Sequence, residues 1–363
     1  MNAYSVVAGM AVAAMMIGAI HTGSVSSDTQ KSTHPPYPTA SLGALAIYDP
    51  VDKYIVMWYA QTWTYSNGSW AILNTATQPP GWSNGCFVWD GAMKYGLFFG
   101  GQAEVAGNLS VVNYTWTFVH GQWTNITSTA GNAPMPVEYA RCAYDVESHS
   151  VILFGGHQNN NANNFSNETW AFKNGKWKEL HPKFSPVPSY GGEMFYDPQM
   201  HDVVLYGGRS GPPYQSEYSA DCSPSFCPYL NATWLYSNGS WSQDNSSAVT
   251  PPGHLFGQVA WDSGCRCAVS FGGQFNWDKV YGDVPNVTYR FKGTWKNDTN
   301  PQDSPGGTFN AAFAYNSADN YILMFGGLNS TTVGTTKDPN TEWNYTWLYS
   351  GGVWTNATPP WIT

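Results

Sequence analysis

The chain has 363 residues and a formal net charge of −9 at pH 7, and only 11% of its residues are charged. A nucleic-acid-binding surface needs a basic stripe, so this composition argues against a nucleic-acid partner. The polar surface must come from Asn, Ser, Thr, Gln and Gly instead, a composition common in proteins that work outside cells.

The chain begins with a 17-residue apolar run, "YSVVAGMAVAAMMIGAI", from Tyr4 to Ile20. A secretory signal normally starts with a basic region, yet no Lys or Arg precedes Lys31. The run is at the short limit for a membrane span, and its spaced small residues let helices pack closely. We expect residues 1–20 to form a retained helix, either a membrane anchor or an assembly helix in a filament; the alternative is an atypical, cleaved signal peptide.

A polar, Pro-containing segment, residues 21–41, follows this run and includes "SSDTQKSTHPPYPTAS". It is expected to be a linker, and from His21 to Leu42 it could span up to ~70 Å if extended. The folded domain is expected to occupy residues 42–363.

One hairpin-like stretch recurs six times in that domain. The pattern is alternating apolar and polar residues, a Gly-containing turn, and a second short strand that begins at Trp, which predicts a β-hairpin. The copies are "QTWTYSNGSW" (Gln61–Trp70), "NYTWTFVHGQW" (Asn113–Trp123), "NETWAFKNGKW" (Asn167–Trp177), "NATWLYSNGSW" (Asn231–Trp241), "NVTYRFKGTW" (Asn286–Trp295) and "NYTWLYSGGVW" (Asn344–Trp354).

A second unit stands before each hairpin. An aromatic residue precedes Asp at Asp49, Asp90, Asp145, Asp197 and Asp262, and precedes Asn316 in the sixth copy. An apolar run then ends in Gly-Gly in every copy except the first, which has Tyr59-Ala60. The Asp or Asn markers are separated by 41, 55, 52, 65 and 54 residues.

Four strands repeated about every 50 residues are typical of a kelch-type β-propeller. Residues 42 to 358 resemble the kelch repeats in the central domain of galactose-oxidase-like proteins. The resemblance implies an all-β, six-bladed propeller, preceded here by the short hydrophobic helix. Eleven of the eighteen Trp fall in the two hairpin columns and Trp89 and Trp261 precede the marker Asp, so this regular spacing indicates packing between blades.

Six cysteines fit an oxidising compartment. Cys222 and Cys227 are close in "DCSPSFC", which predicts a local disulfide. Cys86 and Cys142 lie one alignment column apart near the first strands of neighbouring blades and could join them. The pairing of Cys265 and Cys267 stays open, because a Cys-x-Cys bond is strained and uncommon.

The chain contains fourteen Asn-x-Ser/Thr sequons, where chance predicts about 5. The excess favours N-glycosylation, although five sequons share one repeat column where Asn and Thr could have structural roles. The sequons are Asn67, Asn108, Asn113, Asn125, Asn164, Asn167, Asn231, Asn238, Asn245, Asn286, Asn297, Asn329, Asn344 and Asn356.

The loops between the second and third strands of a blade hold 11, 10, 22, 12 and 16 residues in blades 2 to 6, so their face is the predicted recognition face. Aromatic and amide groups on these loops suit carbohydrate, because rings stack on sugars while amides bind hydroxyls. The alternative is that these side chains pack their own loops. The candidate ligand-binding residues are His157, Tyr214, Tyr218, Trp277 and Trp343.

Catalysis has little support in the sequence. The galactose-oxidase resemblance implies a copper site of two His, two Tyr and a Cys, but the eight His form no His-x-His or His-x-x-x-His pair. A sialidase needs an arginine cluster, and only four Arg exist. We therefore expect no catalytic residues, metal or cofactor.

The predicted function is a glycosylated, extracellular or surface-displayed binding, adhesion or assembly module. Its expected partners are glycans or other surface proteins, together with a membrane or helix bundle at residues 4–20. The alternatives are a filament subunit or homo-oligomer held by the N-terminal helix, and a galactose-oxidase-like or glycan-active enzyme.

Overall fold

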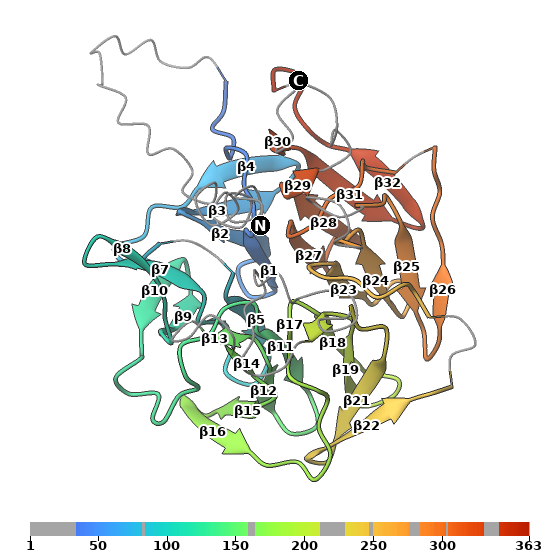
Figure 1. Ribbon diagram of the computed structural model, residues 1–363. Helices are drawn as coiled ribbons and strands as arrows, with labels where there is room; N and C mark the ends of the chain where they lie inside the picture. Colours follow the sequence, from blue (N-terminus) through green and yellow to red (C-terminus); the bar gives the residue numbers. More distant parts are fainter. Residues whose placement is uncertain are drawn as a thin grey trace, which may run out of the picture.

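The computed structural model describes residues 34–81, 84–158, 164–210, 229–246, 250–275, 284–302, 304–329 and 341–362. Six four-stranded antiparallel sheets surround a central axis (Figure 1). The described residues contain strands and turns but no helix, so the predicted all-β, six-bladed propeller is confirmed. The predicted helix at residues 1–20 lies outside the described residues.

Each blade is built from consecutive strands, called A to D from the axis outward. Blade 1 contains β1 (Leu45–Asp49), β2 (Tyr54–Tyr59), β3 (Gln61–Ser66) and β4 (Ser69–Ile72). Blade 2 contains β5 (Cys86–Asp90), β6 (Tyr95–Phe99), β9 (Thr115–Val119) and β10 (Gln122–Asn125). Blade 3 contains β11 (Arg141–Asp145), β12 (Ser150–Phe154), β15 (Thr169–Lys173) and β16 (Lys176–Leu180).

The second half of the chain repeats this order. Blade 4 contains β18 (Glu193–Asp197), β19 (Asp202–Tyr206), β21 (Thr233–Ser237) and β22 (Ser240–Asp244). Blade 5 contains β23 (Gln258–Asp262), β24 (Cys267–Phe271), β25 (Thr288–Phe291) and β26 (Trp295–Asn297). Blade 6 contains β27 (Ala312–Asn316), β28 (Tyr321–Phe325), β31 (Thr346–Ser350) and β32 (Val353–Asn356).

Among the described residues, four two-stranded ribbons lie outside the blades; three are in the connections between strands B and C of one blade, and the fourth pairs the segment before blade 4 with the start of that blade's B–C connection. They pair β7 (Gln102–Val105) with β8 (Asn108–Val111), β13 (His157–Gln158) with β14 (Asn164–Phe165), β17 (Ser189–Tyr190) with β20 (Arg209–Ser210), and β29 (Leu328–Asn329) with β30 (Thr341–Glu342). Blade 1 lacks such a ribbon, because β2 passes into β3 through Ala60 alone.

The marker Asp residues form the turns between strands A and B. The Oδ1 atom of Asp49 accepts hydrogen bonds from the backbone N–H groups of Val51 (2.8 Å) and Asp52 (3.1 Å). Asn316 accepts the equivalent pair from Ala318 and Asp319. A short side chain that bonds its own backbone two or three residues on is a turn-forming device. This explains why the position tolerates either Asp or Asn.

The hairpin Trp residues join neighbouring blades through their indole nitrogens. In each blade the Nε1–H of the strand D Trp donates to the Oγ1 of a buried Thr at the start of strand C in the preceding blade. The six bonds are Trp70 to Thr346 (2.9 Å), Trp123 to Thr62 (2.9 Å), Trp177 to Thr115 (3.1 Å), Trp241 to Thr169 (3.0 Å), Trp295 to Thr233 (3.0 Å) and Trp354 to Thr288 (3.1 Å). We call this set the Trp–Thr ring. It confirms that these Trp pack between blades.

The segment before blade 1 packs on blade 6. Tyr37 OH lies 2.7 Å from Thr346 Oγ1, and the ring of His34 stacks on Trp361 with centroids 4.8 Å apart. Ser41 is fully buried, and its N–H donates to the carbonyl of Trp343 (3.2 Å). The packed domain therefore begins by residue 34, so the last eight residues of the predicted linker (34–41) belong to it.

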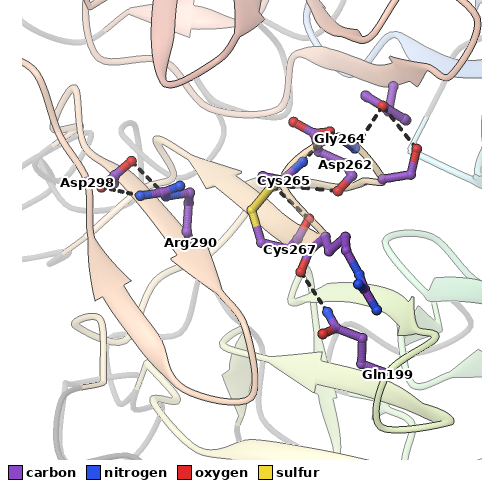
Figure 2. Close-up of a disulfide and its surroundings, with 10 residues drawn as sticks. Gln199, Asp262, Gly264, Cys265, Cys267, Arg290 and Asp298 are labelled. Atoms are coloured by element: carbon purple, nitrogen blue, oxygen red, sulfur yellow. Dashed lines mark hydrogen bonds and ion pairs between the residues drawn. A yellow bond between two sulfur atoms is a disulfide. The ribbon is translucent and has the colours of Figure 1, made fainter.

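Two disulfides lie among the described residues. Cys86 in β5 and Cys142 in β11 join neighbouring inner strands with Cα atoms 6.0 Å apart, as predicted. Cys265 and Cys267 are also bonded, across the A–B turn of blade 5 (Figure 2), which settles the pairing that the sequence left open. The predicted Cys222–Cys227 bond lies outside the described residues.

Candidate functional site

The six inner strands enclose a channel along the propeller axis. Strands β1, β5, β11, β18, β23 and β27 contact one another in a closed circle. They line a cavity of about 600 Å³. Exposed turn residues such as Pro50, Val146 and Pro198 also line it, so the cavity opens on the face that carries the short A–B turns.

The opposite end of the channel is closed by backbone. Six residues, two positions before each inner strand, all have positive φ: Gly43, Asn84, Tyr139, Gly191, Phe256 and Asn310. Five of them donate a backbone N–H to the carbonyl of the preceding member: Tyr139 to Asn84 (2.6 Å), Gly191 to Tyr139 (3.0 Å), Phe256 to Gly191 (2.8 Å), Asn310 to Phe256 (3.0 Å) and Gly43 to Asn310 (2.7 Å). We call this the axial ring.

Aromatic side chains cover the axial ring on the long-loop side. Tyr139, Phe256, Tyr190, Phe165 and Phe309 belong to one buried cluster. The Tyr139 and Phe256 rings are 4.6 Å apart, and Phe165 stacks on Tyr190 at 5.0 Å. The channel is therefore a blind pocket with its only described opening on the short-turn face.

Six aromatic residues surround the opening. Each is the fourth residue of an inner strand, is half-buried and lines the cavity: Tyr48, Trp89, Tyr144, Tyr196, Trp261 and Tyr315. We call this the mouth ring. Burial, followed by the hydrogen bond to Glu147, raises the pKa of Tyr196 to about 12. The Tyr196 phenol therefore stays neutral at physiological pH.

Polar side chains occupy the floor of the channel, which we define as Arg141, Glu193 and Gln258, the first residues of β11, β18 and β23. Glu193 is only 1% exposed. Its Oε1 accepts a hydrogen bond from Ser270 Oγ (2.7 Å) and lies 3.1 Å from His254 Nε2. Its other oxygen, Oε2, is buried without a hydrogen-bond partner.

His254 is cationic in this arrangement. Its Nδ1 lies 3.1 Å from the Pro252 carbonyl, so both ring nitrogens face acceptors and both must carry a proton when Glu193 is ionised. Burial opposes the charged imidazolium, but the Glu193 carboxylate outweighs it, and the pKa of His254 is raised above its ordinary value.

Arg141 has no such partner. None of the hydrogen bonds or ion pairs among the described residues includes its guanidinium, and its Nε atom is buried without an acceptor. Burial lowers the pKa of Arg141 to about 10, although the nearby charge of Glu193 opposes this. Arg141 thus stays cationic at neutral pH while it lines the cavity without a counter-ion in contact.

The two sequence-predicted ligand residues that the structure describes, His157 and Trp343, do not line this cavity. His157 is 5% exposed, with Nδ1 3.1 Å from Glu138 Oε1 and its ring against Phe165, so it packs its own loop, as the alternative interpretation held. Trp343 is half-buried against Tyr345. Tyr214, Tyr218 and Trp277 lie outside the described residues.

The aromatic residues that precede the marker Asp or Asn are the members of the mouth ring. Trp89 and Trp261 pack between blades as predicted, because Trp89 contacts the cluster shared by blades 1 and 2 and Trp261 the cluster shared by blades 4 and 5. All six members also line the cavity, which the sequence did not indicate. No sequence signal placed Arg141 and Glu193 side by side, since they come from different blades.

Two sequon columns have structural roles. In the first, the sequon Thr residues are the acceptors of the Trp–Thr ring: Thr115, Thr169, Thr233, Thr288 and Thr346. In the second, at the end of strand D, the sequon Thr residues Thr127, Thr299 and Thr358 accept the N–H of the first strand C residue. Eight of the fourteen sequons therefore recur for reasons of folding, and their number is not evidence for glycans.

Within the described ranges, no three His, Cys, Asp or Glu side chains converge where a metal ion could sit. The same part of the chain contains no helix that is long and apolar enough to cross a membrane.

No protein-family model matches the chain, and no curated protein matches it. Among solved structures it is similar to one titled "Structure of YjhT", with a TM-score of 0.62 and 13% sequence identity. The match covers 89% of this chain and 99% of that one. At this identity the likeness shows a shared propeller fold.

Proposed function

We propose that this protein is an extracellular binding module and that its ligand site is the central channel, with carbohydrate as the ligand class. The observation that carries the proposal is the mouth ring: six half-buried aromatic side chains surround the open end of a blind, polar-floored cavity. The proposed site is therefore on the face opposite the long loops, which the sequence predicted as the recognition face.

The chemistry of the channel suits a saccharide. Aromatic faces stack on the C–H faces of sugar rings, and a few converging polar groups then fix orientation. The walls supply the aromatic faces, while at the floor Arg141 supplies donors and the unpartnered Oε1 of Gln258 supplies an acceptor. A volume of about 600 Å³ falls within the range of small-ligand pockets.

Several features support an extracellular setting. The two described disulfides persist in oxidising compartments. Glycans on exposed sequon residues such as Asn167 and Asn231 are compatible with the fold, because neither side chain is buried. We propose that residues 4–20 hold the propeller at a membrane or in a bundle of like helices.

A second candidate is a structural role as a filament or particle subunit. It rests on the apolar run with the small-residue spacings Gly9-x-x-x-Ala13 and Ala14-x-x-x-Gly18. This role does not need the channel, so channel variants would leave assembly unchanged.

The test is a glycan array probed with the full-length protein and two variants. Trp89→Ala removes a member of the mouth ring. Phe184→Ala removes an aromatic side chain that is 60% exposed and outside the channel, and serves as the matched control. We expect specific saccharide binding that Trp89→Ala abolishes and Phe184→Ala retains, with thermal unfolding used to confirm that both variants fold. Silence of the wild-type protein, or equal loss in both variants, would reject the proposal.

A further inference from the structure

Arg141 is an unusual group in this chain, which has 15 Lys and Arg against 24 Asp and Glu. It lies at the first position of β11, between Cys86 of β5 and Glu193 of β18 in the circle of inner strands. Its Nε is buried without an acceptor, while the residue lines the cavity.

The neighbouring carboxylate does not neutralise it. Oε1 of Glu193 receives hydrogen bonds from Ser270 and from the imidazolium of His254, and Oε2 is buried without a hydrogen bond from Arg141. His254 does not line the cavity but adds a second cation behind the floor, so Arg141 and His254 face the single carboxylate of Glu193. A desolvated charge without a hydrogen-bonded partner is unfavourable, and buried charges are normally paired or bound to a ligand.

We propose that Arg141 is the binding site for an oxyanion of the ligand, so that the saccharide bound in the channel is acidic and ends in a carboxylate. This inference rests on the proposed function and names the ligand class within it.

The geometry of guanidinium and carboxylate supports the assignment. Arginine presents a planar fork of donors that bonds both oxygens of a carboxylate, and such charge-assisted bonds are about twice as strong as neutral ones. An acidic group at the floor would supply the missing negative charge. The overall charge of −9 disfavours anions in general, so selectivity for the acidic ligand must come from the local field of Arg141 and His254.

The distance from floor to mouth sets the ligand's length. Arg141 and Tyr144 are three positions apart along β11, as are Glu193 and Tyr196 along β18. At about 3.3 Å per residue the two levels lie ~10 Å apart. An oligosaccharide with a terminal uronate can therefore place its carboxylate on Arg141 while a second ring stacks among the mouth-ring aromatics.

The experiment compares four probes by calorimetry on the full-length protein: a uronate-terminated disaccharide, its methyl ester, the neutral parent disaccharide, and the parent with a terminal sulfate. The ester keeps the shape and removes the charge. We expect the uronate to bind on the order of 10- to 100-fold more tightly than its ester, the range for a hydrogen bond to a charged group.

Two variants locate the preference. Arg141→Gln should abolish the difference between acid and ester. Arg290→Gln serves as the control, because Arg290 pairs with Asp298 (2.7 Å) on blade 5 and does not line the channel. It should keep the full difference.

A third variant separates ligand binding from a structural role. Arg141→Met replaces the cation with an apolar side chain of similar length, and should raise the melting temperature of the unliganded protein while it removes the acid preference. A structural arginine would behave in the opposite way, with a lower melting temperature.

The outcomes are distinguishable. Equal binding of acid and ester by the wild type would overturn the inference and leave the carbohydrate site standing. Binding of none of the four probes would overturn both. Preference for the sulfate alone, lost in Arg141→Gln, would retain the oxyanion site and replace the carboxylate with a sulfate ester.

Discussion

The indole nitrogen of Trp70 donates a hydrogen bond of 2.9 Å to Thr346 Oγ1, although the two residues are 276 positions apart. This bond joins blade 1 to blade 6 and closes the propeller. An equivalent Trp–Thr bond joins each of the remaining five pairs of neighbouring blades. Closure therefore uses the repeated interface, without a strand exchanged between the first and last blades.

Replacing Thr346 with Val should destabilise the propeller by about 1–3 kcal/mol, because the buried indole N–H of Trp70 and the hydroxyl of Tyr37 both lose their partner while the β-branched shape is kept. Thr346→Ser retains the hydroxyl and should cost less. Denaturant unfolding measures both changes. Equal stability of the Val variant and the wild type would show that the bond contributes nothing to closure.

Within each repeated sequon, the Thr should be needed for folding and the Asn should be free for modification. Thr169→Val should destabilise the fold by about 1–3 kcal/mol, because Trp241 loses its acceptor. Asn167→Gln abolishes the same sequon but leaves Thr169 in place, so unfolding should change by less than about 0.5 kcal/mol. If both variants were equally destabilised, Asn167 would share the structural role.

Glycan occupancy needs a separate measurement. We expect glycans at several sequons in native material, with Asn113, Asn167, Asn231 and Asn344 among them. Intact mass, compared with the mass after glycosidase treatment, tests this. A native mass equal to that of the bare chain would refute it.

The two described disulfides should differ in their contribution to stability. Cys86–Cys142 closes a loop with a sequence separation of 56, and its removal by Cys86→Ser with Cys142→Ser should cost about 4 kcal/mol. Cys265–Cys267 has a separation of only 2, and its turn is also held by Asp262 Oδ1, which accepts from Gly264 N at 2.7 Å (Figure 2). Its removal should cost less than about 2 kcal/mol. Chemical denaturation of the two double variants measures the loss in free energy of unfolding. A larger loss on removing Cys265–Cys267 than on removing Cys86–Cys142 would contradict the prediction.

The buried His254–Glu193 pair makes stability depend on pH. The folded pKa of His254 is raised above its ordinary value of 6.5, so the folded state binds this proton more tightly than the unfolded state. The stabilisation is complete below pH 6.5 and is lost as the pH rises through the folded pKa.

Unfolding free energies measured between about pH 6 and 9 should therefore fall with pH in the wild type. The slope should flatten in His254→Gln, which still donates to Glu193 but does not titrate. His181→Gln is the control, because His181 is on the surface with its side chain 79% exposed. An unchanged slope in His254→Gln would assign the pH dependence to other groups.

The N-terminal run should be present in the mature protein. N-terminal sequencing of native material tests this, and a chain that starts near Ser24 would show that residues 4–20 are a removed signal. The protein would then be secreted without this anchor.

The fold was predictable because its signals repeat. Six Gly-containing hairpins and six Asp or Asn turn markers fix the number and order of the strands, and no distant contact is needed to interpret them. The site was less predictable. Glu193 lies beside Arg141 and contacts His254 only once blades 3, 4 and 5 are arranged around the axis, and each of the three resembles an isolated polar residue in the sequence. The mouth-ring aromatics were visible as a column, but their exposure depends on the width of the channel, which sequence spacing does not give.

The stacking of His34 on Trp361 has a topological consequence, since the two ends of the described chain lie together on blade 6. A short peptide could join them, and new ends could be opened in any hairpin turn, such as the one at Asn174 and Gly175. Every Trp–Thr bond would survive such a circular permutation, because none depends on which blade comes first. The order of the blades along the chain is thus one of several orders that would give the same propeller.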